Sequence, residues 1–232
     1  MALTTASGII CIKSGKGVKE VNKETLRKKK EEIRAEIKKT AAELPASYFV
    51  EAGAEIVRHM LSLDVYRTAC VIMAYWSMPG EPPTRDLIKD ALEHGKTVLL
   101  PRCVDKERMI ALPFTDEKDL QPGKLGIPEP VLIDRAASCD ISDARAAASG
   151  EDPAEAFPSL PDPDLIIVPC VAASADGRRL GHGAGYYDRF LTEHESKTVC
   201  LCFGRFLRDD IPVDENDVMM DLVLTEEKKY LL

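Results

Sequence analysis

The sequence lacks the features that mark secreted, membrane-spanning and fibrous proteins. Its seven cysteines are an odd number and include no Cys-x-x-Cys pair, which argues against a disulfide scaffold and against a zinc ribbon. No apolar run approaches the roughly 20 residues of a membrane-spanning helix. The 45% hydrophobic and 30% charged fractions exclude collagenous and disordered chains. We therefore expect a globular protein of a reducing compartment, the cytoplasm, without a membrane partner.

Positive charge is scarce outside the N-terminal part of the chain. The formal net charge is −8, and residues 1–40 contain eleven Lys and Arg against five Glu, so residues 41–232 carry a net charge of −14. An acidic body repels the phosphates of nucleic acids, and we expect no nucleic-acid partner. The basic stretch either binds a smaller anion or solvates a helix.

The chain is predicted to form one α/β domain over residues 23–232, preceded by a tail. Residues 1–22 have no sustained periodicity, which predicts a flexible tail; an organelle-targeting role stays open for this acid-poor segment. Residues 134–163, rich in Ala, Asp, Ser and Pro, are predicted to be a surface excursion from the domain.

The basic stretch has the pattern of a helix from Asn22 to Leu44 that Pro45 ends. Its apolar face comprises Leu26, Ile33, Ile37 and Leu44. Lys30 falls on that face and Arg34 lies at its border, whereas Lys28, Lys29, Lys38 and Lys39 point largely to water. A lysine in a core-facing register needs an anionic partner to offset its desolvation.

The central part of the chain alternates strand and helix patterns. Strands are predicted at 68–76, 97–100, 109–114, 164–169, 198–203 and 222–225, and further helices at 47–61, from Thr84 to Gly95, and at 186–194. Strand–helix–strand units form parallel sheets that helices cover. The sequence therefore predicts an α/β fold with a mainly parallel or mixed central sheet.

The densest motif is RLGHGAGYYDRF, residues 179–190, between a buried strand and a helix. Three glycines at alternate positions free the backbone to turn successive N–H groups toward one anion, and the helix start adds its own amides. Asp188, in the first helical turn, can cap the helix or hold Mg²⁺. The motif suits a phosphate, although it is neither a Rossmann fingerprint nor a P-loop.

Five ordered segments of this chain resemble motifs of the 5-formyltetrahydrofolate cyclo-ligase family. They are KEEIR at 30–34, SMPGEPPT at 77–84, LLPR at 99–102 with GIPEP at 126–130, the glycine motif at 179–190, and IPVDENDVMMDLVLTE at 211–226. The resemblance implies a three-layer α/β/α domain and a monomeric enzyme. It also implies an ATP- and Mg²⁺-dependent reaction that converts 5-formyltetrahydrofolate, with or without a polyglutamate tail, to 5,10-methenyltetrahydrofolate with release of ADP and phosphate.

The resemblance implies roles for residues that match the family motifs. Lys30 and Arg34 are expected to bind the ATP phosphates, and Asp188 and Asp217 to bind Mg²⁺. The remaining ATP-binding residues are expected to be Arg179, Leu180, Gly181, His182, Gly183, Ala184, Gly185, Tyr186 and Tyr187. The folate is expected to contact Trp76, Glu81, His182, Gly183, Ala184, Gly185 and Tyr186. The catalytic group is expected to comprise Lys30, Arg179, Gly183, Gly185 and Tyr187.

Three positions depart from the family pattern. Ala184 stands where a Gly or a basic residue is common, His182 where an aromatic or basic residue is common, and Cys170 where Gly is usual. These changes leave two alternatives open, a divergent ATP-binding paralogue of another pathway, such as thiamine-related metabolism, and a non-catalytic folate-binding module. Arg102 is a candidate for an anionic group of either substrate, with a structural ion pair as the alternative.

Overall fold

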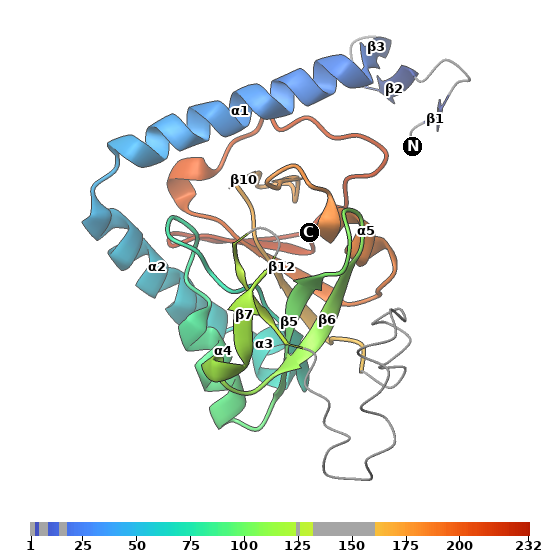
Figure 1. Ribbon diagram of the computed structural model, residues 1–232. Coiled ribbons are helices and arrows are strands. Elements are labelled where there is room, and N and C mark those ends of the chain that lie inside the picture. Colours follow the sequence, from blue (N-terminus) through green and yellow to red (C-terminus); the bar gives the residue numbers. More distant parts are fainter. Residues whose placement is uncertain (1–2, 5–8, 14–17, 124–125, 132–160) are drawn as a thin grey trace, which may run out of the picture.

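The computed structural model describes residues 3–4, 9–13, 18–123, 126–131 and 161–232. A seven-stranded sheet forms its centre, and Figure 1 shows helices on both sides of it. The strand order is β14 (Lys229–Leu231), β13 (Leu222–Leu224), β12 (Lys197–Leu201), β9 (Leu165–Val168), β4 (Val71–Met73), β5 (Thr97–Cys103) and β6 (Met109–Phe114). The five inner strands pair in parallel and the two edge strands are antiparallel. The predicted fold class is confirmed.

The direction of the chain through the sheet reverses between β4 and β9. From β4 the chain passes through α4 (Arg85–Glu93) to β5, and from β9 it passes through α5 (Tyr186–Thr192) to β12 in the opposite direction. Because crossovers between parallel strands are right-handed, α4 and α5 cover opposite faces of the sheet. Such a reversal opens a crevice at the carboxyl ends of the two strands, where α/β proteins bind ligands.

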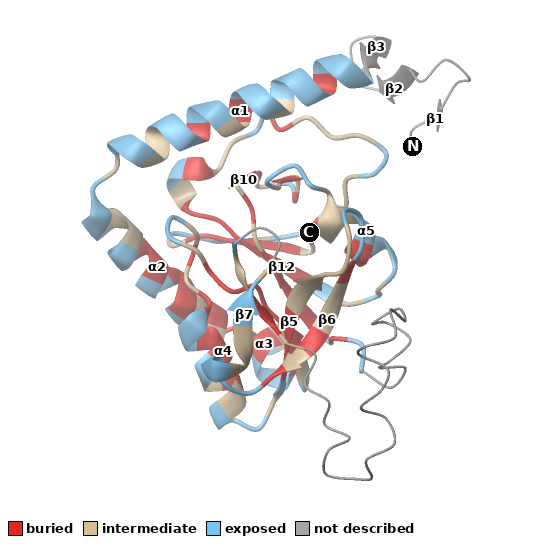
Figure 2. Ribbon diagram, viewed as in Figure 1, coloured by how far each residue is buried: buried red, intermediate tan, exposed pale blue. Residues whose placement is uncertain are grey.

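The helices that precede β4 form the rest of the helical cover. α1 (Lys23–Glu43) buries Leu26, Ile33 and Ile37, as the heptad-like spacing predicts. α2 (Ala46–Leu61) packs against α3 (Asp64–Thr68), α4 and β13. In Figure 2, buried residues form inner stripes on α1 and α2 and fill the sheet. Every residue of β9 is fully buried, as expected of a strand covered on both faces.

Several predicted elements differ in extent from the structure. The strand predicted at 68–76 is shorter and covers only Val71–Met73. Thr68 ends α3, and the Asp164 carboxylate accepts the backbone N–H groups of Cys70 and Val71 where β4 begins. The strand at 222–225 is not the last one, since β14 follows it. The loop that contains GIPEP forms an antiparallel hairpin of β7 (Leu120–Pro122) and β8 (Pro128–Pro130) after the short 3₁₀-helix η1 (Glu117–Asp119).

Two predicted surface segments have different outcomes. Residues 1–22 include three short antiparallel strands, β1 (Leu3–Thr4), β2 (Ile9–Lys13) and β3 (Val18–Asn22), which the sequence pattern did not indicate; the flexibility of this tail stays a prediction. The excursion at 134–163 lies outside the described residues, apart from residues 161–163. Among the described residues, the structure contains no helix long and apolar enough to cross a bilayer.

The inner face of α2 offers a direct test of the packing. Ile56 is 0% exposed, whereas Val50 on the same helix is 72% exposed. Ile56→Ala is expected to lower the free energy of unfolding by about 2–5 kcal/mol, because it leaves a cavity in the core. Val50→Ala should change it by less than about 0.5 kcal/mol. Urea unfolding followed by circular dichroism measures both; similar losses in the two variants would contradict the described placement of α2.

Candidate functional site

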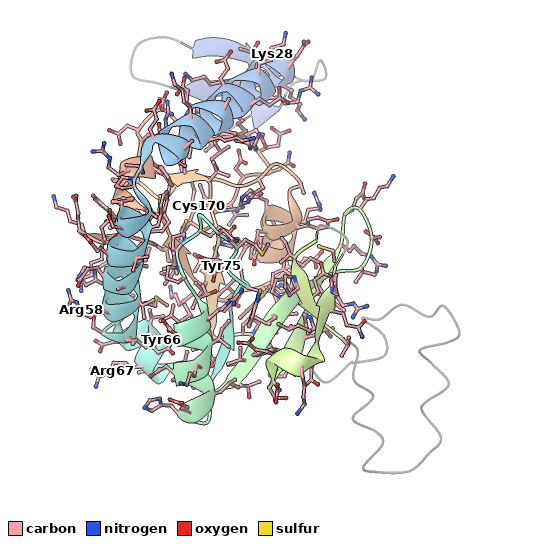
Figure 3. The ribbon with its side chains drawn as sticks, turned by 60° about the vertical axis from the view of Figure 1, so that its left-hand side comes forward. Lys28, Arg58, Tyr66, Arg67, Tyr75 and Cys170 are labelled. Carbon is pink, nitrogen blue, oxygen red and sulfur yellow. The ribbon has the colours of Figure 1, made fainter. Side chains whose placement is uncertain are left out.

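A cavity of about 1090 Å³ lies at the carboxyl ends of β4 and β9, where the direction of the chain reverses. Residues that are far apart in sequence line it, among them Lys30 and Arg34 of α1, Trp76 and Glu81 after β4, the whole glycine motif from Arg179 to Arg189, and the segment 214–217. In Figure 3, Tyr75 and Cys170, which follow β4 and β9, lie in the interior of the molecule, whereas Lys28 of α1 points outward. All the residues that the family resemblance assigns to ATP, folate or Mg²⁺ line this cavity.

The glycine motif forms one wall of this cavity. Gly183 and Gly185 have positive φ angles of 104° and 71°, and Gly185 immediately precedes α5. Side chains rarely adopt this backbone region. A Cβ atom at Gly183 would also lie 3.3 Å from the guanidinium of Arg34. The predicted need for glycine at these two positions has a direct structural reason.

Arg179 is held inside the protein at the base of the motif. Its guanidinium donates to Asp188 over 2.6 Å and to the carbonyl oxygen of Pro169 over 3.3 Å, and it lies 5.9 Å from the centre of the Tyr187 ring. The side chain is 3% exposed, and within the described part of the chain its Nε atom has no hydrogen-bond partner. The ion pair links the strand before the loop to the first turn of α5. Arg179 therefore stabilises the shape of the loop.

Lys30 of α1 contacts two carboxylates that line the cavity. Its Nζ lies 2.9 Å from Asp214 and 2.6 Å from Asp217, and the side chain is 13% exposed. Burial disfavours the charged lysine, yet the hydrogen bonds to the two carboxylates outweigh it and raise the pKa of Lys30. Burial also raises the pKa of Asp217. The expected anionic partner of this lysine exists within the chain, and Asp214 was not predicted, although it stands three residues before Asp217.

Arg34 lies one helical turn after Lys30 and reaches the glycine motif. Its Nε donates to the carbonyl oxygen of Gly181 over 2.8 Å. Burial lowers the pKa of this guanidinium, which remains a cation at neutral pH. Lys30 and Arg34 are therefore the half-buried basic residues of α1 at the cavity, where Lys23 and Arg27 also line the wall, while Lys28 and Lys29 are exposed. This is the division that the helical register predicted.

Glu81 is presented by the loop that follows β4. One of its oxygens accepts the backbone N–H of Met78 over 2.9 Å, and the other lies 3.8 Å from Nε2 of His182 in the glycine motif. The side chain is 18% exposed. Burial raises the pKa of Glu81 above the ordinary value of 4.5. This carboxylate therefore stands at the border between the loop and the rest of the cavity.

Aromatic residues line the cavity on two sides. Trp76 is buried, and its ring centre lies 5.6 Å from that of Phe114. The guanidinium of Arg85 lies 4.6 Å from the centre of the Trp76 ring. The Tyr186 hydroxyl donates to the carbonyl oxygen of Asp105, which connects the glycine motif to the β5–β6 turn. The Tyr187 hydroxyl is buried and has no hydrogen-bond partner among the described residues. Arg102 lies outside the cavity wall and donates to the carbonyl oxygen of Pro130.

The two predicted metal ligands both line the cavity, but each contacts a basic residue. Asp188 pairs with Arg179 and Asp217 pairs with Lys30. The backbone N–H of Val218 lies 3.5 Å from Asp188, so the residue after Asp217 approaches the other carboxylate. Within the described part of the chain, no group of three or more His, Cys, Asp or Glu has an arrangement suited to a metal ion. A metal here would need oxygen atoms from a bound ligand.

Comparison with known proteins gives a consistent match. The model of the 5-formyltetrahydrofolate cyclo-ligase family matches residues 24–226. The chain is 34% identical to the 5-formyltetrahydrofolate cyclo-ligase of Mycolicibacterium smegmatis, covering 77% of this chain and 84% of that one, and 27% identical to the Mus musculus enzyme of the same name, covering 88% and 96%. The NMR structure of Aquifex aeolicus 5,10-methenyltetrahydrofolate synthetase has a TM-score of 0.67 at 24% identity, covering 87% of this chain and 92% of that one. The similarity to the Aquifex aeolicus structure supports the α/β fold described above.

The raised pKa of Glu81 predicts a pH-dependent stability difference. A carboxyl whose pKa is raised in the folded protein binds its proton more tightly there than in the unfolded chain, so stability falls as the pH rises from 4.5 through the raised value. Glu81→Gln cannot titrate and keeps an oxygen for the Met78 N–H. We expect this variant to unfold at a higher temperature than the wild type at pH 7 and at a similar temperature near pH 4.

Thermal unfolding of both proteins between pH 4 and 8 measures this difference. Glu93→Gln, at an exposed position at the end of α4, serves as the control and should follow the wild type. A Glu81→Gln variant that is less stable than the wild type at pH 7 would contradict the described burial of this carboxylate.

Proposed function

The chain belongs to the 5-formyltetrahydrofolate cyclo-ligase family, and we propose that its cavity binds ATP and 5-formyltetrahydrofolate side by side. The protein is an ATP-dependent ligase that forms 5,10-methenyltetrahydrofolate, with release of ADP and phosphate. The assignment of the site rests on one observation: two different kinds of residues line the same cavity and meet at Glu81. Basic side chains and the glycine loop form one half, Trp76 and other apolar residues form the other, and Glu81 stands between them.

The reaction requires charge neutralisation and positioning more than a nucleophilic side chain. The formyl oxygen attacks the γ-phosphorus of ATP and ADP leaves; the N10 nitrogen of the folate then attacks the formyl carbon, and loss of phosphate closes the methenyl ring. Groups that hold the phosphates and align the two nitrogens with the formyl carbon lower the barriers of both steps. The residues of this cavity are of these kinds.

We assign the phosphates of ATP to the basic half. Lys30 and Arg34 approach the loop from α1, and the amides of Gly183 and Gly185 lie where a positive φ turns the backbone. Ala184 adds no charge there, and Leu180, Gly181 and Tyr187 complete the wall. Arg179 keeps the loop in place through Asp188. Lys30 would have to exchange Asp214 and Asp217 for a phosphate oxygen when the nucleotide binds.

We assign Mg²⁺ to Asp188 and Asp217. Carboxylate and phosphate oxygens are the ligands that Mg²⁺ prefers, and the two side chains reach the cavity beside the segment that ends at Val218. When bound there, the ion would neutralise charge on the phosphate that is transferred. Arg179 and Lys30 supply positive charge to the same carboxylates in its absence, which is consistent with a cation site.

We assign the reacting end of the folate to Glu81, with His182 beside it. Trp76 and Tyr186 offer ring faces to the pterin. A paralogue of another pathway would share the phosphate half but has no need for a buried carboxylate at this border. A binding module would leave Lys30 and Arg34 without a role, so neither alternative is favoured.

We further propose a monomer that works in the cytoplasm. Lys30, Trp76, Glu81 and the glycine motif of the same chain line the cavity, and the five described cysteines are free thiols. The net charge of −14 in residues 41–232 favours a small phosphate-bearing ligand over a nucleic acid. A polyglutamate tail on the folate would extend from the cavity toward its mouth.

The test is formation of the methenyl chromophore by the purified protein. Mixed with 5-formyltetrahydrofolate, Mg²⁺ and ATP, the protein is expected to produce methenyltetrahydrofolate absorbance in proportion to the ATP hydrolysed, and to stop when EDTA is added. No ATP-dependent signal would overturn the proposed function. The same assay measures two variants, Lys30→Ala and Glu81→Gln.

The two variants are expected to have different defects. Lys30→Ala should raise the KM for ATP by about 10- to 100-fold, the effect of losing a charged hydrogen bond, while the Kd for the folate stays unchanged. Glu81→Gln should impair folate use while the Kd for ATP stays unchanged. Lys28→Ala, on the exposed side of α1, is the control. Identical defects in both variants would contradict the division of the cavity.

A further inference from the structure

A second carboxylate lies in the apolar half of the cavity, and no motif-based role explains it. Glu129 stands in the middle of β8, is 9% exposed, and lines the cavity. No described residue donates a hydrogen bond to its carboxylate or forms an ion pair with it. Its oxygen atoms are not among the described buried side-chain atoms that lack a partner, so they are open to the cavity that the residue lines. A ligand with N–H donors would find two acceptor oxygens there.

The surroundings of Glu129 are apolar and rigid. The β7–β8 hairpin packs against β5 and β6, and these strands and the residues just before β8 contribute Pro101, Met109, Ile127 and Pro128 to the same cavity. Prolines flank Glu129 on both sides, so neither neighbour has an N–H to offer it. This part of the cavity forms an apolar slot with one pair of oxygen atoms.

The Glu129 side chain lies over Gly123 of the hairpin. A Cβ atom at Gly123 would lie 2.2 Å from Cδ of Glu129, so a larger residue at position 123 would require the Glu129 side chain to move. The N–H of Gly123 donates to the carbonyl oxygen of Ile127 over 2.8 Å. Glycine at position 123 therefore leaves room for the carboxylate where it lies.

The two carboxylates occupy different surroundings. Glu81 lies 3.8 Å from His182 of the glycine motif and holds the N–H of Met78, which places it beside the phosphate half. Glu129 contacts no described residue of the glycine motif through a hydrogen bond. If the formyl group lies near the phosphates, as the proposed function requires, the opposite end of the pterin enters the slot.

We propose that Glu129 binds the 2-amino group and the N3–H of the pterin, and so fixes the orientation of the ring. These two N–H groups lie parallel on one edge, at the end of the bicycle opposite the reacting nitrogen, and two carboxylate oxygens match such a pair. The inference rests on the proposed function and deepens it. Glu129 positions the substrate, while Glu81 stands at the reacting end.

Calorimetric titration with 5-formyltetrahydrofolate in the absence of ATP tests this role. Glu129→Gln keeps the size of the side chain but brings an amide N–H against the donors of the ring. We expect its Kd for the folate to rise by about 10- to 100-fold, with the Kd for ATP unchanged. Glu117→Gln, at an exposed position near the hairpin, should bind both ligands as the wild type does.

A substrate analogue separates direct contact from a structural effect. With the 2-desamino-2-methyl analogue, the wild type should bind more weakly, and Glu129→Gln should cause little additional loss. The melting temperature of the ligand-free variant should stay close to that of the wild type, because no described residue forms a hydrogen bond or ion pair with the Glu129 carboxylate. An equal loss for both folates, or a lowered melting temperature, would overturn the assignment in favour of a structural role.

The outcome also distinguishes this inference from the function on which it rests. A wild-type protein that converts 5-formyltetrahydrofolate while Glu129→Gln binds it normally would overturn only the role of Glu129. A wild-type protein that neither binds nor converts the folate would overturn both.

Discussion

The buried ion pair between Arg179 and Asp188 is the interaction on which the site depends. It joins the strand before the glycine loop to the first turn of α5, and a further hydrogen bond ties the same guanidinium to Pro169 at the end of β9. A buried pair of this kind contributes little net stability but is strongly destabilising when one partner is lost. The loop therefore has a fixed shape before any ligand arrives, which is the condition for electrostatic preorganisation.

The cavity contains more charge than a folded chain requires for stability. Lys30 forms ion pairs with two carboxylates. Glu81 and Glu129 lie in or beside apolar surroundings. Among the described residues, the Tyr187 hydroxyl and the Nε of Arg179 have no hydrogen-bond partner. Desolvated groups of this kind cost stability, and functional sites commonly retain them. Under the proposed function, a phosphate would be a new partner for Lys30, and a folate would be a new partner for Glu81 and Glu129.

The sequence predicted those parts of the molecule whose signals are local. The register of α1 separated Lys30 and Arg34 from the exposed lysines, and the apolar run of β9 indicated a strand buried on both faces. The hairpin β7–β8 was not predicted, because its prolines are typical of a loop. For the same reason, Glu129 in this hairpin was not predicted as a site residue. Asp214 was missed because its role depends on a contact with Lys30, 184 positions away, which no local pattern records.

The central claim is that one cavity holds a nucleotide and a folate at the same time, in its two halves. Trp76 is the only tryptophan of the chain and lines this cavity, so its fluorescence reports on occupancy. Titration of 5-formyltetrahydrofolate in the presence and absence of a saturating non-hydrolysable ATP analogue is the most direct test. The account predicts one folate bound per chain in both cases, with equal or higher affinity when the nucleotide is present. Competition between the two ligands would contradict it.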